Sequence, residues 1–294
     1  MFFDANRSIK ALEQIANEKL TNVQNWLHAN KLALNIKKSS FLIFYPVQQK
    51  LSFQVIISCN GEVFKQDHCI KYLGIMFDSH LNWKDHVKLV ANKIKRDIGI
   101  ISKIRLFVNE TILINLYYTL IYPFLNYGIT ALGNTYSTAL KPLLILQKRV
   151  LRLITFLEYR EHTNPFFIKF NILKLQDLVS FNNALFVYNF STGNLPNTFE
   201  SFVTLIKNQH NYQTRLASKS SFALPKARTN YGKFRIRFAG AKVWNSIDEN
   251  IKDVPSSSIF KSKLKKHLLN FYLSIIVYIY IYIYIYIYIY KIYI

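Results

Sequence analysis

The hydrophobic period of this chain changes after Asp78, and that change constrains the fold more than any other feature of the sequence. Before Asp78, short apolar runs separated by turn residues are typical of strands. From Trp83 to Ile104, apolar residues recur at intervals of three and four, which places them on one face of a long helix. We therefore expect an α+β fold in which a small β region precedes a mainly helical part.

The β region is expected between Asn30 and Asp78. Asn60-Gly61 tolerates the positive φ angles of a tight type I′ turn, so residues 55–59 and 62–65 are predicted to form a hairpin. Residues 70–77 are expected to return beside that hairpin as a third strand. The result would be a small antiparallel sheet.

Two further elements are predicted in the first third of the chain. Ser8 can cap a helix over residues 9–27, because apolar residues there share one helical face. The apolar run at residues 41–44 is short enough for one buried strand, and Lys37 and Lys38 stand at its entrance.

Three helices are predicted after Asp78. The first runs from Trp83 to Ile104, the second is capped by Asn109 and is ended or kinked at Pro123, and the third opens at Ser137. Basic residues lie largely off the apolar face of the first helix and near the end of the third: Lys93, Lys95, Arg96, Lys103, Arg105, Lys148, Arg149 and Arg152.

The charge balance favours a polyanionic partner. The chain holds 38 Lys and Arg against 16 Asp and Glu, a formal net charge of +22 that is spread along the sequence. Nucleic acid is the first candidate and an anionic membrane surface the second. Cys59 and Cys69 form no CxxC pair, so neither a disulfide framework nor a zinc site is indicated, and both are interpreted as small strand residues.

Several sequence strings resemble LINE-type, Jockey-like reverse transcriptases of non-LTR retrotransposons. LNIKKS and KYLG resemble the last part of the palm, and LNWKDHV, LYYTLIYPFLNYG and LQKRVLRLIT follow in the family's order and spacing. Over roughly residues 5–272 the resemblance implies the carboxy-terminal half of such an enzyme. It divides the chain into a palm end at 1–80, a helical thumb at 81–160, a mixed, mainly helical carboxy-terminal region at 161–272 and a low-complexity tail at 273–294.

The resemblance also assigns roles to individual residues. Lys38 corresponds to a lysine near the phosphates of the incoming nucleotide, where it can neutralise charge or act as a general acid. Lys71, Tyr72, Leu73 and Gly74 correspond to the primer grip, a hairpin that holds the primer end. The alternative interpretations are that Lys38 is simply solvated and that the four residues form an ordinary turn into a strand, with Gly74 marking a bulge. The basic residues of the helices would contact nucleic acid.

Catalysis in this family uses two magnesium ions that aspartates hold, including an adjacent Asp-Asp pair. This chain contains no adjacent Asp-Asp pair, and Asp4 stands alone. We therefore expect no metal site and no bound cofactor in these residues, and no polymerase activity from them alone. The expected partner is an RNA–DNA or DNA primer–template, and the family implies an intracellular setting, nuclear or cytoplasmic.

The last parts of the chain leave several interpretations open. Between residues 226 and 238, basic and aromatic residues interleave, which fits either a phosphate-and-stacking surface or an exposed strand with one buried face. Residues 278–290 alternate strictly between Ile and Tyr. A translated AT repeat is the simplest account, and a membrane span or an aggregation-prone strand is the alternative. A basic membrane-associated protein and a domesticated nucleic-acid-binding module are the competing functions.

Overall fold

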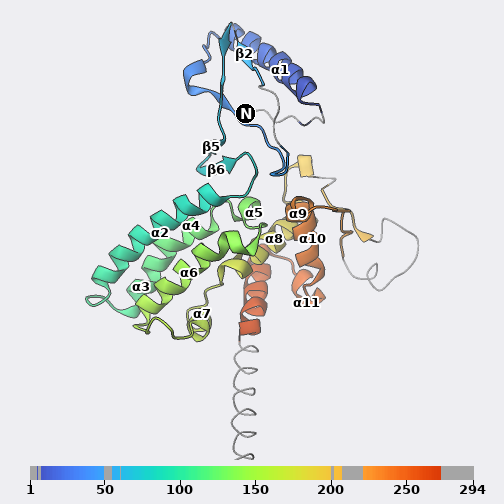
Figure 1. Ribbon diagram of the computed structural model, residues 1–294. Coiled ribbons are helices and arrows are strands. Elements are labelled where there is room, and N and C mark those ends of the chain that lie inside the picture. The colour runs from blue at the N-terminus through green and yellow to red at the C-terminus, as the bar shows by residue number, and fades with distance from the viewer. Residues whose placement is uncertain are drawn as a thin grey trace, which may run out of the picture. The chain divides into compact units, whose positions relative to one another are not determined.

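The computed structural model describes residues 5, 8–49, 55–59, 61–199, 202–206 and 221–272 (Figure 1). The chain divides into two compact units, Met1–His86 and Val87–Ile294. The predicted thumb beyond His86 and the predicted carboxy-terminal region therefore belong to one unit, the second. The Ile-Tyr tail lies outside the described residues.

The first unit opens with α1 (Ile9–Ala29), which the sequence predicted. Ser8 caps it, because its side chain accepts a hydrogen bond from the Ala11 amide at 3.4 Å. No residue of α1 is buried, and Trp26 on its predicted apolar face is 60% exposed. Polar contacts tie the helix to the β region: the Asn17 amide group donates to the Ile56 carbonyl at 3.1 Å and accepts from the Ser58 amide at 3.0 Å.

The β region is made of short two-stranded ladders. The ladders are β1 (Ser40–Phe41) with β4 (Lys65–Gln66) in parallel, β2 (Ser58–Cys59) with β3 (Glu62–Val63) antiparallel, and β5 (Cys69–Tyr72) with β6 (Ile75–Asp78) antiparallel. The prediction of a single antiparallel sheet is therefore wrong for the described residues. The buried strand predicted at residues 41–44 is also wrong, because pairing stops at Phe41 and Phe44 is 39% exposed.

The two hairpins differ in how well their turns could be predicted. The β2–β3 hairpin is confirmed: Cys59 pairs with Glu62, and Gly61 between them has φ +82°. Residues 70–77, however, do not form one strand beside it. They belong to a second hairpin, β5–β6, whose turn residues Leu73 and Gly74 have φ of +46° and +82°, the two positive angles of a type I′ turn.

A buried carboxylate organises the loop that follows β6. The side chain of Asp78 accepts hydrogen bonds from the backbone amides of His80, Asn82 and Trp83 at 3.1, 3.0 and 2.9 Å. Trp83 has φ +62°, an angle that residues with side chains seldom adopt. The Asp78 carboxylate holds the loop in this conformation and so sets where the long helix that follows it, which starts at Lys84, begins.

The second unit is mainly helical in its described residues, and one isolated antiparallel bridge joins Leu205 to Phe222. Its elements are α2 (Lys84–Ile104, whose first turn lies in the first unit), α3 (Glu110–Leu116), a π-helical turn η2 (Tyr117–Ile121), α4 (Tyr122–Asn126), α5 (Ile129–Leu132), α6 (Ser137–Ile154), α7 (Asn164–Lys169), α8 (Leu175–Ser191), a 3-10 turn η3 (Asn197–Phe199), α9 (Asn230–Phe234), α10 (Ile236–Asn245), α11 (Glu249–Lys252) and a last helix over residues 257–272. The predicted long helix α2 is confirmed, and its apolar residues Ile94, Ile98 and Ile101 are buried. The predicted interruption near Pro123 is confirmed as well, since the π-helical turn precedes α4 there.

A buried glutamine joins the predicted thumb to the region that follows it. Gln147 on α6 is fully buried, and its side-chain nitrogen donates to the Tyr117 hydroxyl and to the Leu173 carbonyl, each at 2.9 Å. Its oxygen accepts from the Leu175 amide at 2.9 Å. Burial raises the pKa of the Tyr117 phenol, so this hydroxyl stays protonated. The network fixes α6 against the π-helical turn and the start of α8.

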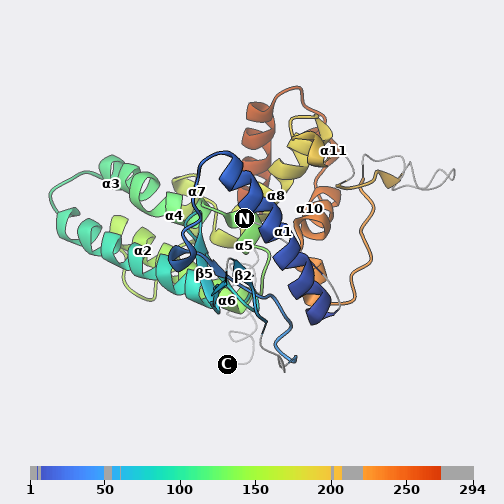
Figure 2. The ribbon, with the colours of Figure 1, turned by 90° about the horizontal axis from the view of Figure 1, so that it is seen from above.

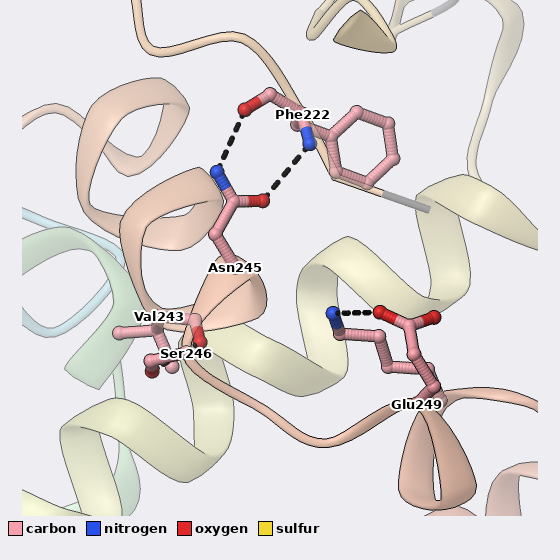
Figure 3. A network of polar contacts seen from close by, with 6 residues as sticks. Phe222, Val243, Asn245, Ser246 and Glu249 are labelled. Carbon is pink, nitrogen blue, oxygen red and sulfur yellow. Dashed lines mark hydrogen bonds and ion pairs between the residues drawn. The ribbon is translucent and has the colours of Figure 1, made fainter. Parts of the chain in front are cut away.

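Helices α8 and α10 lie side by side and carry the core of the carboxy-terminal region (Figures 1 and 2). Gly240 permits their close approach, because a Cβ atom there would lie 2.9 Å from the Val187 Cγ2 atom. The Asn245 side chain makes two hydrogen bonds with the Phe222 backbone, to its carbonyl at 2.8 Å and from its amide at 2.9 Å (Figure 3). These bonds anchor the segment that starts at Ser221 to the end of α10.

Candidate nucleic-acid interface

The tip of the β5–β6 hairpin presents the four predicted primer-grip residues to solvent. Lys71 pairs with Met76 and Tyr72 with Ile75, so the two residues come directly before the turn. Lys71 and Gly74 are exposed, while Tyr72 and Leu73 are 40% and 71% exposed. A cation and an aromatic ring at an exposed turn provide one group for a phosphate and one for a base or sugar.

The turn itself is strained at Leu73. A side chain in the left-handed region costs about 1–2 kcal/mol, because its Cβ crowds the backbone. Asn tolerates this region better, so Leu73→Asn is expected to stabilise the hairpin by about 0.5–1 kcal/mol. Amide hydrogen exchange across residues 69–78 should slow about two- to fivefold. Gly74→Ala is the opposite control and should speed exchange; equal exchange in all three proteins would contradict the strained turn.

Lys38 lies in a short 3-10 turn, η1 (Ile36–Lys38), directly before β1. The Asn35 side chain caps this turn and accepts from the Lys38 amide at 3.1 Å. The Lys38 side chain is exposed, as is that of Lys37. Within the described part of the first unit, no hydrogen bond or ion pair connects Lys38 to the hairpin tip.

The predicted basic residues of α2 fall into two groups. Lys95, Arg96 and Lys103 are exposed, and the last two stand seven residues apart and so share one face. Arg96 also lies beside a buried acid, with its Nε 3.5 Å from Asp97 Oδ1. Lys93 is half-buried, and its ammonium lies 5.0 Å from the ring centre of Phe124 on α4.

The basic residues around the end of α6 divide in the same way. Arg105, just after α2, contacts the end of α6, since its guanidinium donates to the Leu153 carbonyl at 3.4 Å and lies 5.0 Å from the ring centre of Phe156. Arg152 donates from Nε to the Glu161 carbonyl at 3.1 Å. Lys148 is half-buried and Arg149 is exposed.

The predicted cations therefore do not form one uniform surface. Lys95, Arg96, Lys103 and Arg149 are exposed, whereas Lys93, Arg105 and Arg152 make contacts that stabilise the unit itself. Periodicity places a residue on a helical face but does not show which neighbour covers its head group, so the sequence could not separate the two groups.

The segment with interleaved basic and aromatic residues is mainly helical from Asn230 onward. Residues 230–234 form α9 and residues 236–245 form α10, so the interpretation as an exposed strand is wrong. Two rings near the ends of α2 and α6, Phe107 and Tyr159, are 84% and 86% exposed, but exposure alone does not assign them to the interface.

Neither a metal centre nor a membrane span is found in the parts of the chain that the structure describes. There, no group of three or more His, Cys, Asp or Glu side chains is placed to bind a metal ion. Likewise, no helix among these residues combines the length and the apolar composition that crossing a bilayer requires.

Comparison with known proteins gives a distant similarity. No protein-family model and no solved structure matches the chain. The RNA-directed DNA polymerase from mobile element jockey of Drosophila melanogaster is 25% identical over 153 residues, which are 51% of this chain and 16% of that protein. The match thus spans about a sixth of the relative's length. It supports a distant relationship to a LINE-type reverse transcriptase.

Proposed function

We propose that this chain corresponds to the carboxy-terminal half of a Jockey-like reverse transcriptase and binds a primer–template. In this proposal residues 1–80 are the end of the palm, 81–160 the thumb and 161–272 the region after it. The observation that carries it is the β5–β6 hairpin, which exposes Lys71 and Tyr72 and leads through the Asp78 loop into the basic helix α2. The distant similarity to the jockey polymerase supports the relationship to reverse transcriptases on which the proposal depends.

The exposed cations of α2 are the groups that would hold the duplex. Lys95, Arg96 and Lys103 extend over more than two helical turns, about 12 Å at 1.5 Å per residue, which matches several phosphates along one strand. Such contacts neutralise charge and release counterions, so they carry no base preference. The hairpin tip would position the primer end, and Lys38 would contact a phosphate.

Nucleotidyl transfer is not part of the proposed function of these residues. Two magnesium ions about 4 Å apart need several carboxylates in one place. The sequence holds no adjacent Asp-Asp pair, and the described residues hold no cluster of acids that fits such a centre. The carboxylates of the described residues therefore do not fit the two-magnesium centre that the intact family enzyme uses.

Replacing Lys95, Arg96 and Lys103 together by Ala is the test of duplex binding. We expect the slope of log Kd against log salt for an RNA–DNA primer–template to fall by about two to three, roughly 0.9 for each lost phosphate contact. The matched control replaces Lys261, Lys263 and Lys266, exposed residues of the last helix, with the same loss of charge. Equal slope changes in the two triple variants would contradict the proposed interface.

A primer-extension assay on the same protein tests the second half of the proposal. We expect no added nucleotides with magnesium and all four deoxynucleotides present, although the primer–template binds. Template-dependent extension that persists through purification, and that is absent from a parallel preparation of an unrelated protein, would show that these residues support catalysis.

A further inference from the structure

A second cationic surface lies in the carboxy-terminal region, away in sequence from α2 and the hairpin tip. Its centre is a group of three rings: Tyr136 before α6, and Tyr231 and Phe234 on α9. The Phe234 ring centre lies 4.9 Å from that of Tyr136 and 6.3 Å from that of Tyr231, and both pairs meet edge to face. Tyr136 and Tyr231 are 46% and 38% exposed. Two tyrosine rings are thus held by a shared partner and remain open to solvent.

The residues next to this ring group are strongly basic. The cations are all exposed: Lys226, Arg228, Lys233, Arg235 and Arg237. Residues 221–247 contain no Asp or Glu, and neither do residues 129–157, which include Tyr136 and α6. Among the described residues, no carboxylate pairs with any of these cations. We call the three rings and five cations the α9 surface.

The α9 surface is built on a well-anchored backbone. Thr229 caps α9, because its hydroxyl accepts from the Gly232 amide at 3.1 Å. The Asn230 side chain donates to the Tyr136 hydroxyl at 3.1 Å and so joins α9 to the start of α6. The bonds between Asn245 and Phe222 hold both ends of the segment that carries these residues (Figure 3). Local order of this kind lowers the entropy cost of binding a ligand.

We propose that the α9 surface binds single-stranded nucleic acid. Unpaired bases can stack on the exposed tyrosine rings, while the surrounding cations neutralise the backbone phosphates. A duplex keeps its bases stacked inside and would use only the cations. The proposal goes beyond duplex binding by α2, because it involves other residues and another form of nucleic acid, and it does not depend on that function.

An anionic membrane is the competing partner, and the structure disfavours it. Binding in the plane of a membrane requires an amphipathic helix with a broad exposed apolar face. Helix α9 has five residues, and α10 uses its apolar residues Ala241 and Trp244 to pack in the core. The exposed rings at this surface are tyrosines, whose flat faces suit bases.

The test of stacking compares two exposed tyrosines in the full chain. The probe is a fluorescein-labelled 20-nucleotide oligothymidylate, and binding is measured by anisotropy. Tyr231→Ala should weaken binding about tenfold, whereas Tyr231→Phe, which keeps the ring face, should stay within about twofold of the wild type. Tyr159→Ala is the matched control, since Tyr159 is 86% exposed and lies outside the α9 surface; it should leave binding unchanged.

A pair of charge variants tests the phosphate contacts. Replacing Lys226 and Lys233 together by Ala should lower the slope of log Kd against log salt for the oligothymidylate by about 1.4, roughly 0.7 for each lost contact with a single strand. Replacing Lys261 and Lys266 together by Ala removes the same charge from the last helix. This control should change the slope by less than half as much as the Lys226 and Lys233 variant.

Three outcomes would overturn the proposal. The first is an equal loss of binding in Tyr231→Ala and Tyr159→Ala, and the second is an equal slope change in the two double-lysine variants. The third is a Tyr231→Ala variant that binds the oligothymidylate normally but loses binding to phosphatidylcholine vesicles with 30% phosphatidylserine. Duplex binding by α2 is tested by the α2 triple variant in a separate measurement. If that test fails, the comparison of Tyr231→Ala with Tyr159→Ala still decides whether the α9 surface binds a single strand.

Discussion

Gln147→Leu is expected to destabilise the second unit by about 3–6 kcal/mol. The substitution keeps the size of the side chain but replaces its polar amide with an apolar group, which removes three hydrogen bonds from a fully buried site. The Tyr117 hydroxyl, the Leu173 carbonyl and the Leu175 amide would each lose a buried partner, at about 1–3 kcal/mol per group. Because a domain of this size is stable by about 5–15 kcal/mol, the loss is a large share of the total.

Calorimetry and urea unfolding of the purified chain measure this loss. A fall of about 6–24 °C in Tm corresponds to such a change for a unit of this size. Gln176→Leu is the matched control, because Gln176 stands on the exposed side of α8 and should change stability by less than about 0.5 kcal/mol. If the two substitutions have the same effect, the three hydrogen bonds contribute little to folding.

The Gln147 network also shows why the predicted boundary between the thumb at 81–160 and the region at 161–272 does not separate two compact units. Both partners beyond that boundary, Leu173 and Leu175, use backbone groups, which no side-chain pattern reveals. From the sequence, Gln147 looks like one more polar residue among the basic residues at the end of α6. Its burial becomes evident only when the neighbouring elements are in place.

Long periodic helices were the most predictable part of the fold. Helices α1, α2 and α6 agree with the spacing of their apolar residues, and Ser8 and Asn109 cap helices as their residue types suggest. The Asn60-Gly61 signal located the β2–β3 hairpin, although Asn60 lies outside the described residues. Helix faces, helix caps and tight turns are determined by residues that are close together in the chain. They can therefore be predicted from the sequence alone.

The second hairpin could not be found in this way. Leucine is a poor residue for positive φ, so Leu73-Gly74 lacks the usual signal of a type I′ turn. The strands on either side must supply the free energy that holds the strained turn. For the candidate site, the family resemblance pointed to Lys71 to Gly74, but no sequence signal predicted that these residues lie at an exposed hairpin tip.

The second large effect is expected at Tyr272, the last described residue. Its side chain is 3% exposed, its hydroxyl donates to the Asp177 carboxylate, and it accepts from the Lys174 amide at 3.0 Å. The Lys174 ammonium lies 4.0 Å from the centre of its ring. Tyr272 thus attaches the last helix to the start of α8. Any variant in which the Ile-Tyr tail is removed must therefore keep this residue.

We expect a chain that ends at Ser274 to melt as the full chain does and to be more soluble, because uncharged alternating β-formers promote aggregation. In that shortened chain, Tyr272→Ala should cost about 3–5 kcal/mol through the lost ring and the lost hydrogen bonds. Calorimetry of the two shortened proteins and the full chain measures both effects. A shortened chain that no longer folds would show that residues 275–294 pack against the body.

Tyr272→Phe isolates the hydroxyl group and gives this prediction a pH dependence. Burial raises the pKa of Asp177 above its ordinary value of 3.8, and the hydrogen bond from Tyr272 opposes that rise. Without the hydroxyl, the folded-state pKa of Asp177 rises further, so the folded protein loses stability wherever Asp177 is ionised in the unfolded chain. The variant should therefore lose about 2 kcal/mol at pH 7, and the loss should shrink as the pH falls toward 3.8. A loss that is the same at pH 7 and pH 4 would show that the hydroxyl acts through packing and not through the Asp177 carboxylate.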